Sequence, residues 1–190
     1  MKKAIIRSTP FGPVAILWSL QGREPRICRI FLSRPGFSAI NEASGLFPDA
    51  KSSSCSDIGM IADRIKAFLS GENIEFDLGC IRLDLCPPFQ RAVLRAEFMI
   101  PRGQISTYRL IAAHLGSARG ARACGNALAN NPFPIIIPCH RAIRSDLTLG
   151  GYQGGLAMKR ALLENEGIGF DARGRVAAKR LHYSRGLQSK

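Results

Sequence analysis

Short apolar runs, separated by polar and turn-forming residues, dominate the first half of the chain. Residues 3–7, 13–19 and 27–32 are rich in Val, Ile and Leu, and Pro, Gly or charged residues stand between them. This pattern predicts three strands with tight connections, and therefore a small antiparallel sheet. Residues 33–56 contain Pro, Gly, Ser and Asn throughout, which predicts a loop.

The spacing of apolar residues becomes helical after this loop. From Asp57 to Ser70, Ile and Leu recur at intervals of three or four residues, and Gly71 follows. We therefore predict a helix that ends at this glycine. We also predict a short strand over residues 74–78.

Beyond Cys86-Pro87-Pro88 the pattern is that of helices. Four are predicted: over 89–99, from Ser106 or Thr107 to about 115, over 120–129 and over 156–166. The first would bury a face made of Phe89, Val93, Leu94 and Phe98.

The second and third of these helices are joined by Gly116-Ser117-Ala118, which makes them a helix-turn-helix candidate. An Asn-Pro-Phe-Pro stretch at 131–134 cannot continue a helix. The apolar residues 135–137 after it predict a buried extended segment.

These elements predict an α+β fold with two subdomains and a tail. We expect an N-terminal α/β subdomain at 1–85 and a C-terminal domain at 86–170. The basic residues and weak apolar periodicity of 171–190 predict a flexible tail that touches phosphates.

The charge of the chain narrows the possible partners. There are 27 Lys and Arg against 14 Asp and Glu, a net charge of +13. Such a surplus favours polyanions, with nucleic acid first and an anionic membrane surface second, although a basic protein without a specific partner fits the charge as well. No apolar stretch is long enough to span a membrane, and the N-terminus lacks the apolar core of a signal peptide. We expect no membrane partner and a location in the cytoplasm, or in the nucleus of a eukaryote.

The cysteine pattern argues against disulfides and structural metal. The six cysteines are Cys28, Cys55, Cys80, Cys86, Cys124 and Cys139. They form no CxxC pair, and the chain has only three histidines. We therefore expect free thiols, most of them buried, and no metal site. The sequence assigns no role to the first four.

One cysteine stands in a setting that suits chemistry. Pro138 ends an apolar run and restricts the backbone just before Cys139, and His140 follows. A thiol reacts as its thiolate, which a neighbouring histidine favours. A Cys-His dipeptide taken alone is more often a structural cysteine than a nucleophile.

The dipeptide lies within a longer pattern. Residues 121–141 read ARACGNALANNPFPIIIPCHR, with Gly103–Tyr108 upstream and Gly151–Leu156 and 162–167 downstream. This stretch resembles the active-site region of the O6-alkylguanine-DNA alkyltransferases, in order from about 88 to 167. The first 85 residues fit that family only by size and strand pattern.

The resemblance implies both a reaction and a fold. The reaction is repair of double-stranded DNA by direct, single-use transfer of the O6-alkyl group of guanine to Cys139. The target nucleotide is flipped out from the minor groove, and a monomer acts with no cofactor and no metal. The implied fold joins a ribonuclease H-like subdomain to a winged-helix-like one.

The same resemblance implies four catalytic residues. Cys139 would accept the alkyl group, and His140 would take the thiol proton through a water. Glu166 would orient the imidazole, and Asn131 would hold the active-site turn.

Ten further residues would bind the substrate. They are Tyr108, Arg122, Ala123, Gly125, Leu128, Pro134, Ala142, Tyr152, Gln153 and Lys159. Arg122 would fill the gap left by the flipped base, although a phosphate contact explains an exposed arginine equally well. The small residues of its helix suit close approach to the minor groove, or equally packing against another helix. Gln153 is larger than the usual small residue, which puts tolerance of bulky adducts in doubt.

Two other functions remain as alternatives. A relative that binds alkylguanine without transfer would lack the reactive cysteine, which is present here. An unrelated thiol hydrolase would explain neither the Asn-Pro-Phe-Pro run nor the helix-turn-helix.

Overall fold

The computed structural model describes residues 1–178 and 181–184, and the chain divides into two compact units. Unit 1 comprises Met1–Cys86 and Pro132–Ile136, and unit 2 comprises Pro87–Asn131 and the chain from Ile137 onward. The predicted boundary near residue 86 thus differs in one respect, because 132–136 belong with unit 1. No helix of the described residues is long and apolar enough to cross a membrane.

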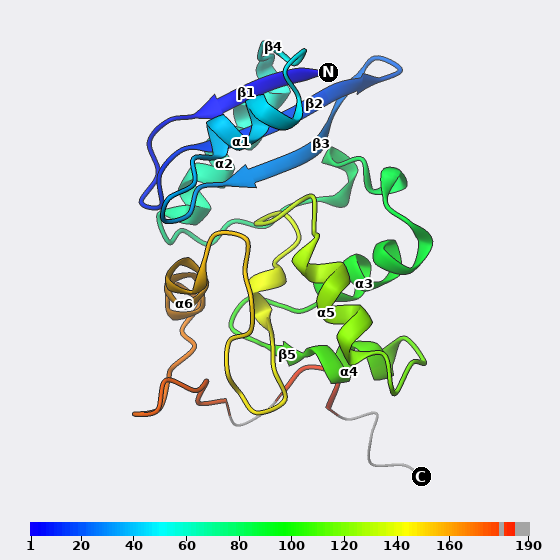
Figure 1. Ribbon diagram of the computed structural model, residues 1–190, viewed down its shortest axis with the longest axis vertical. Helices are drawn as coiled ribbons and strands as arrows, with labels where there is room; N and C mark the ends of the chain where they lie inside the picture. Colours follow the sequence, from blue (N-terminus) through cyan, green and yellow to red (C-terminus); the bar gives the residue numbers. More distant parts are fainter. Residues whose placement is uncertain (179–180, 185–190) are drawn as a thin grey trace. The chain divides into compact units, whose positions relative to one another are not determined.

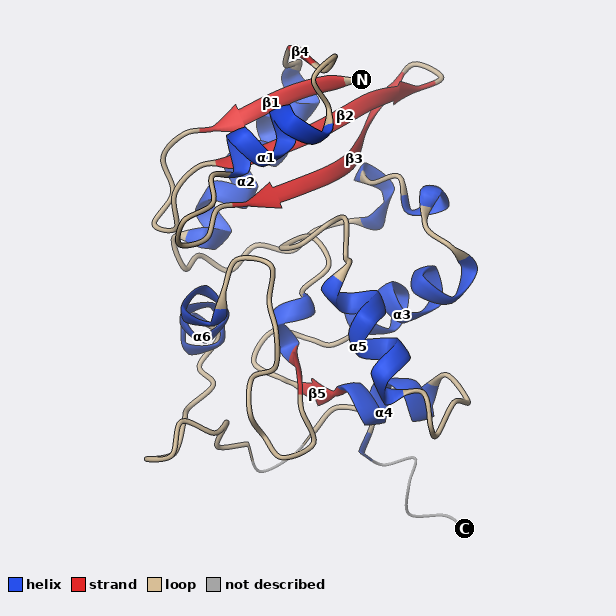
Figure 2. Cartoon of the chain, viewed as in Figure 1, coloured by secondary structure: helices blue, strands red, loops and turns tan. Residues whose placement is uncertain are grey.

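Unit 1 is built on a four-stranded sheet in the order β3-β2-β1-β4 (Figure 2). Its strands are β1 (Lys2–Ile6), β2 (Val14–Gln21), β3 (Glu24–Leu32) and β4 (Lys51–Ser52). The first three are antiparallel neighbours, as predicted, whereas β4 pairs parallel to β1. The fourth strand was not predicted because its two residues are exposed and polar.

Two helices pack on this sheet, and only one of them follows from the apolar pattern. The predicted helix is α2 (Ser56–Leu69). The other, α1 (Ala39–Leu46), lies in the segment predicted as a loop. It buries only Ala39 and Ala43, against Leu17 and Phe31 of the sheet, so it carries no strong apolar stripe.

Two segments predicted as extended do not form strands. The strand at 74–78 is absent, and the 3-10 turns Leu78–Cys80 and Leu83–Leu85 follow instead. Residues 135–137 are buried but form no strand, because Ile135 has a φ of 78°. A β-branched residue rarely adopts this left-handed conformation, and no glycine at this position indicates it in the sequence.

Unit 2 contains the predicted helices (Figure 1). They are α3 (Pro88–Phe98), α4 (Tyr108–His114), α5 (Ala121–Ala129) and α6 (Leu156–Asn165). The 3-10 turn η3 (Cys139–Arg141) leads into β6 (Ala142–Ile143), which pairs parallel to β5 (Ser106–Thr107). Helices α4 and α5 pack against each other around the predicted turn, whose Gly116 has a φ of 77°.

The buried face of α3 differs from the predicted one. Val93 and Leu94 are buried as expected, but Phe89 is 44% exposed and Phe98 only half-buried. Glu97 is fully buried in their place. Apolar periodicity could not reveal this, because the residue that completes the face is an acid.

The C-terminal segment predicted as a flexible tail makes packing and hydrogen-bond contacts with unit 2 at 171–178 and 181–184. Val176 is buried with Ile105 and Leu163, and its amide donates to the Leu147 carbonyl at 2.9 Å. The Tyr183 hydroxyl donates to the Ala96 carbonyl at 2.8 Å. Residues 179–180 and 185–190 lie outside the described part.

Removing the cap of α4 should destabilise unit 2. The Thr107 hydroxyl oxygen accepts from the Leu110 amide at 3.1 Å, which satisfies one of the free donors of the first turn. We expect Thr107→Ala to cost about 1 kcal/mol in urea unfolding. Thr107→Ser keeps the acceptor and should restore most of the loss; equal losses in both variants would contradict a capping role.

Candidate active site

Cys139 opens a tight turn that is held by backbone and amide hydrogen bonds. The Cys139 amide donates to the Ile137 carbonyl and the Arg141 amide to the Pro138 carbonyl, both at 2.8 Å. The Asn131 side-chain amide donates to the same Ile137 carbonyl at 3.1 Å. The thiol is thereby presented on a rigid support and is only 5% exposed.

The surroundings of this thiol favour its neutral form in the resting protein. Burial raises the pKa of Cys139 to about 12, and the carboxyl group of Glu97 contributes to the increase. A hydrogen bond from Asn131 and the charge of Lys159 act in the opposite direction but do not outweigh burial. Formation of the thiolate therefore needs a base nearby.

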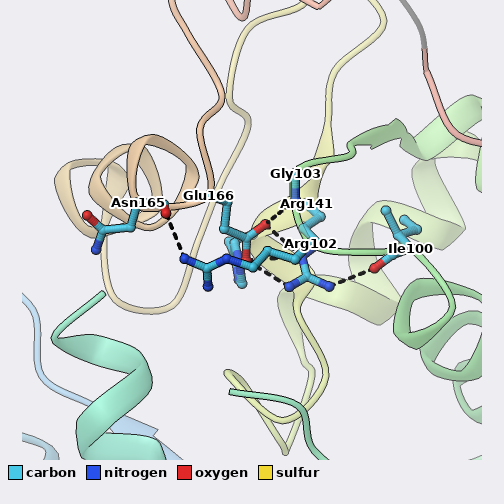
Figure 3. A network of polar contacts seen from close by, with 7 residues as sticks. Ile100, Arg102, Gly103, Arg141, Asn165 and Glu166 are labelled. Atoms are coloured by element: carbon cyan, nitrogen blue, oxygen red, sulfur yellow. Dashed lines mark hydrogen bonds and ion pairs between the residues drawn. The ribbon is translucent and has the colours of Figure 1, made fainter. Parts of the chain in front are cut away.

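A buried carboxylate lies at the centre of the polar network behind the turn (Figure 3). Glu166 Oε1 is 2.9 Å from His140 Nε2 and accepts from Arg141 Nη2 at 2.8 Å. The other oxygen, Oε2, accepts from Arg141 Nε at 2.9 Å. Arginine thus grips the carboxylate with two parallel hydrogen bonds while histidine shares one oxygen.

This arrangement sets the protonation states of the acid and the imidazole. Burial opposes ionisation of Glu166, but the hydrogen bonds from His140 and Arg141 outweigh it and lower its pKa to about 2. Burial lowers the pKa of His140, and Glu166 offsets this only in part. Since an ionised carboxylate only accepts, Nε2 must carry the imidazole proton, which leaves Nδ1 as the basic nitrogen.

Arg141 is a member of this network that the sequence analysis did not assign. Besides gripping Glu166, it donates through Nη1 to the Ile100 carbonyl at 2.6 Å. Nearby, Arg102 donates to the Asn165 carbonyl at 2.7 Å and so secures the end of α6 (Figure 3). The signal was available, because a buried acid needs a cationic partner and an arginine follows His140 directly.

Cys139 lines a cavity of about 240 Å³ in unit 2. Five of the predicted substrate residues also line it: Tyr108, Gly125, Leu128, Tyr152 and Gln153. Five lining residues were not predicted: Asn126, Ala129, Arg144, Gly150 and Gly151. Most of these belong to the loop at 144–151, whose sequence shows no motif that would predict a binding role. Residues of the C-terminal half of α5 and of this loop thus line the cavity together with the Cys139 sulfur.

Tyr108 is held against the loop by a position that only glycine suits. Gly150 has a φ of +68°, and a Cβ atom there would lie 2.7 Å from the Tyr108 hydroxyl oxygen. Burial raises the pKa of Tyr108 to about 12, so the phenol keeps its proton and can donate.

Gln153 and Lys159 tie the walls of the cavity together. The Gln153 side-chain amide donates to the carbonyls of Asn131 at 2.7 Å and Ala129 at 3.3 Å. The Lys159 ammonium is fully buried and donates to the carbonyls of Ala142 and Leu149, both at 2.6 Å. Lys159 and Ala142 are not among the residues that line the cavity, and their role toward the substrate stays a prediction.

The remaining predicted residues lie apart from the cavity lining. Arg122 and Ala123 are exposed on α5. Pro134 is buried in unit 1 and does not belong to the unit that contains the cavity. His140, Glu166 and Asn131 are buried behind Cys139 rather than open to the cavity. Within the described part of the chain, no group of three or more His, Cys, Asp and Glu is placed to hold a metal ion.

Comparisons with known proteins show which family this chain resembles. Residues 88–168 match the family model for the DNA-binding domain of 6-O-methylguanine DNA methyltransferase. The crystal structure of Mycobacterium tuberculosis O6-methylguanine methyltransferase is similar to this chain with a TM-score of 0.67 and 31% identity, over 87% of this chain and 92% of that one. The chain belongs to the O6-methylguanine-DNA methyltransferase family.

Relatives identified by sequence match a smaller part of the chain. A methylated-DNA–protein-cysteine methyltransferase of Methanothermobacter thermautotrophicus is 45% identical over 114 residues, which are 60% of this chain and 64% of the relative. The Mycobacterium bovis relative is 45% identical over 55% of this chain and 62% of its own length. The matches thus span less than two thirds of these relatives, and membership of the methyltransferase family rests on the fold as well.

Loss of the Glu166 charge should destabilise the protein strongly. Gln in its place keeps the shape but leaves the buried Arg141 guanidinium without its counter-ion. We expect Glu166→Gln to lower the free energy of unfolding by about 3 kcal/mol at pH 7. Glu164→Gln, which breaks the exposed pair with Arg160, is the matched control and should have almost no effect.

The loss of unfolding free energy in Glu166→Gln should become smaller as the pH falls. Because the pKa of Glu166 is lowered from 4.5 to about 2, its stabilisation is complete above about pH 4.5 and is lost as the pH falls toward 2. The difference between wild type and Glu166→Gln in urea titrations should therefore shrink over that range. A difference that stays constant with pH would show that the ionised carboxylate is not its source.

Proposed function

We propose that this protein repairs double-stranded DNA by transferring the O6-alkyl group of guanine to Cys139, once per chain. The observation that carries the proposal is the placement of a shielded thiol in a 240 Å³ cavity, directly before a histidine that a buried carboxylate orients. This is the order of nucleophile, base and orienting acid that activates weak nucleophiles.

The chemistry follows from the protonation states of these groups. His140 Nδ1 takes the Cys139 proton through a water, and Glu166 stabilises the imidazolium that forms. The thiolate attacks the alkyl carbon, a sulfur–carbon bond forms, and the carbon–oxygen bond breaks with its electron pair going to O6. The resulting thioether is a very poor leaving group, so the protein acts once and needs no cofactor.

The cavity residues suit a purine turned out of the helix. A base inside a duplex cannot bring its O6 atom to a buried thiol, so the nucleotide must be extruded. Tyr108 keeps its phenolic proton and can donate to the base, while Leu128 and Tyr152 provide apolar walls. Gln153 connects the loop to the end of α5 through its hydrogen bonds to the Ala129 and Asn131 carbonyls. Asn131 holds the turn that presents the sulfur.

The helix-turn-helix of α4 and α5 provides the DNA-binding element. A net charge of +13 favours a polyanion, and the related Mycobacterium tuberculosis protein has been crystallised in complex with DNA (32% identity, TM-score 0.67, 87% of this chain and 92% of that one). Exposed Ala123 and the small Gly125 permit close approach to the minor groove, with Arg122 beside them. We propose that a monomer acts in the cytoplasm, since the relatives come from bacteria and archaea.

Recognition of alkylguanine without transfer is the second candidate, because the same cavity and helix-turn-helix could serve binding alone. The presence of Cys139 on the cavity wall favours transfer. The two functions differ in whether a covalent product forms.

A mass measurement distinguishes these functions. After incubation with O6-methylguanine DNA, we expect the intact protein to gain the mass of one methyl group, located on the peptide that contains Cys139. Cys139→Ser should gain nothing, and Cys55→Ser, which changes an exposed cysteine, should react like the wild type. Tight binding of the lesion with no mass gain would favour recognition alone.

Substitution of Arg122 tests how the base is extruded. If its planar guanidinium fills the gap in the duplex, Arg122→Lys should slow transfer on duplex DNA about as much as Arg122→Ala, by at least tenfold, because an ammonium cannot replace the fork. Reaction with the free O6-methylguanine base should be unchanged. Full rescue by Lys, with the salt dependence of binding retained, would assign Arg122 to a phosphate contact. Arg109→Ala, an exposed arginine of α4, is the control for charge alone.

A further inference from the structure

Arg144 lines the cavity, but the reaction described above gives it no role. Of the described residues that line the cavity together with Cys139, it is the only Lys, Arg, Asp or Glu. The residue is exposed to solvent. Within the described part of the chain, its guanidinium group forms no hydrogen bond and no ion pair. Five N–H donors at the cavity are therefore available to an anion from outside the chain.

The backbone of Arg144 is held in a hydrogen-bonded turn. The Arg144 amide donates to the Thr148 carbonyl at 3.0 Å, and the Leu147 amide donates to the Arg144 carbonyl at 3.1 Å. The neighbouring acid, Asp146, is engaged by Thr148, whose amide and hydroxyl donate to Asp146 Oδ1 at 3.0 and 2.7 Å. Because the turn fixes the start of the arginine side chain, less conformational entropy is lost when this side chain binds a ligand.

The other end of the same loop lies against Tyr108, the phenol proposed to contact the base. A Cβ atom at Gly150 would lie 2.7 Å from the Tyr108 hydroxyl oxygen, and both residues line the cavity with Arg144. Burial raises the pKa of Tyr108, and the positive charge of Arg144 partly offsets this rise. The guanidinium group is therefore on the side of the cavity where the phenol lies.

The substrate carries anions that would reach this position. Every nucleotide within a DNA strand has a phosphate on each side of its sugar. When a base leaves the duplex and enters the cavity to reach Cys139, its sugar and the flanking phosphates stay at the opening. An exposed arginine on the cavity lining can meet one of them, and its planar fork matches two oxygens of a phosphate.

We propose that Arg144 binds a phosphate that flanks the flipped nucleotide and so holds the alkylated base in the cavity. The proposal rests on alkyl transfer from DNA to Cys139 as the function, and it adds a specific contact to that function. This role differs from that of Arg122 on α5, which would fill the gap in the duplex. The contribution of Arg144 should depend on the DNA backbone and not on the alkyl group.

The test combines a variant with DNA that lacks one charge. Duplexes contain O6-methylguanine and either normal phosphates or a neutral methylphosphonate on the 5′ or the 3′ side of the lesion. Affinity is measured in the Cys139→Ser background, where no transfer occurs. One of the two methylphosphonates should weaken binding about tenfold, because a hydrogen-bonded charge pair is lost. Arg144→Gln should weaken binding of normal DNA by a similar factor and should abolish that methylphosphonate effect.

The exposed Arg173→Gln, which removes a charge from the C-terminal segment of unit 2, is the matched control. It should retain the full methylphosphonate effect. If neither methylphosphonate weakens binding, or if each does so equally with and without Arg144, the proposal is overturned.

The reaction of otherwise wild-type protein with the free O6-methylguanine base separates a phosphate contact from a base contact. This substrate has no phosphate, so Arg144→Gln should react with it at the rate of the wild type. A slower reaction would assign Arg144 to the base and overturn the proposal. Lesion binding without transfer by the wild type would reject the proposed transfer, whereas the methylphosphonate measurement would still decide the role of Arg144.

Discussion

The active site depends on one buried carboxylate with two partners. Glu166 accepts two hydrogen bonds from the Arg141 fork and shares an oxygen with His140, and its side chain is almost completely shielded from water. The arginine keeps the acid ionised, and the ionised acid fixes which imidazole nitrogen carries the proton. Without this pair of contacts, burial would leave the acid neutral and the histidine without a defined tautomer.

Burial raises the pKa of the Cys139 thiol and lowers the pKa of the His140 imidazole, and the proposed function requires both effects. It keeps both the Cys139 thiol and the His140 imidazole neutral, which prepares the proposed proton transfer between them. The hydrogen bonds of Asn131 and the charge of Lys159 supply the opposing influence that a thiolate needs. The pKa of one sulfur atom thus reflects several groups of unit 2.

Most helices and strands could be predicted from the apolar pattern, because burial of one face requires periodicity. The exceptions have physical causes. Helix α1 buries only small alanines, and the short β4 is exposed, so neither leaves a stripe. Residues 135–137 are apolar and buried, but the left-handed backbone at Ile135 removes them from any strand. Local composition does not encode these outcomes.

For the site, the sequence alone singled out the residues that we propose carry the chemistry: a cysteine before a histidine within a family pattern, with a distant acid at the end of the last helix. Tertiary structure decided how they are used. It brought Arg141 to Glu166, tied Lys159 to the Ala142 carbonyl, and buried Glu97 on α3. Hydrogen-bond partners and dielectric surroundings depend on segments far apart in the chain, and no spacing within one segment reports them.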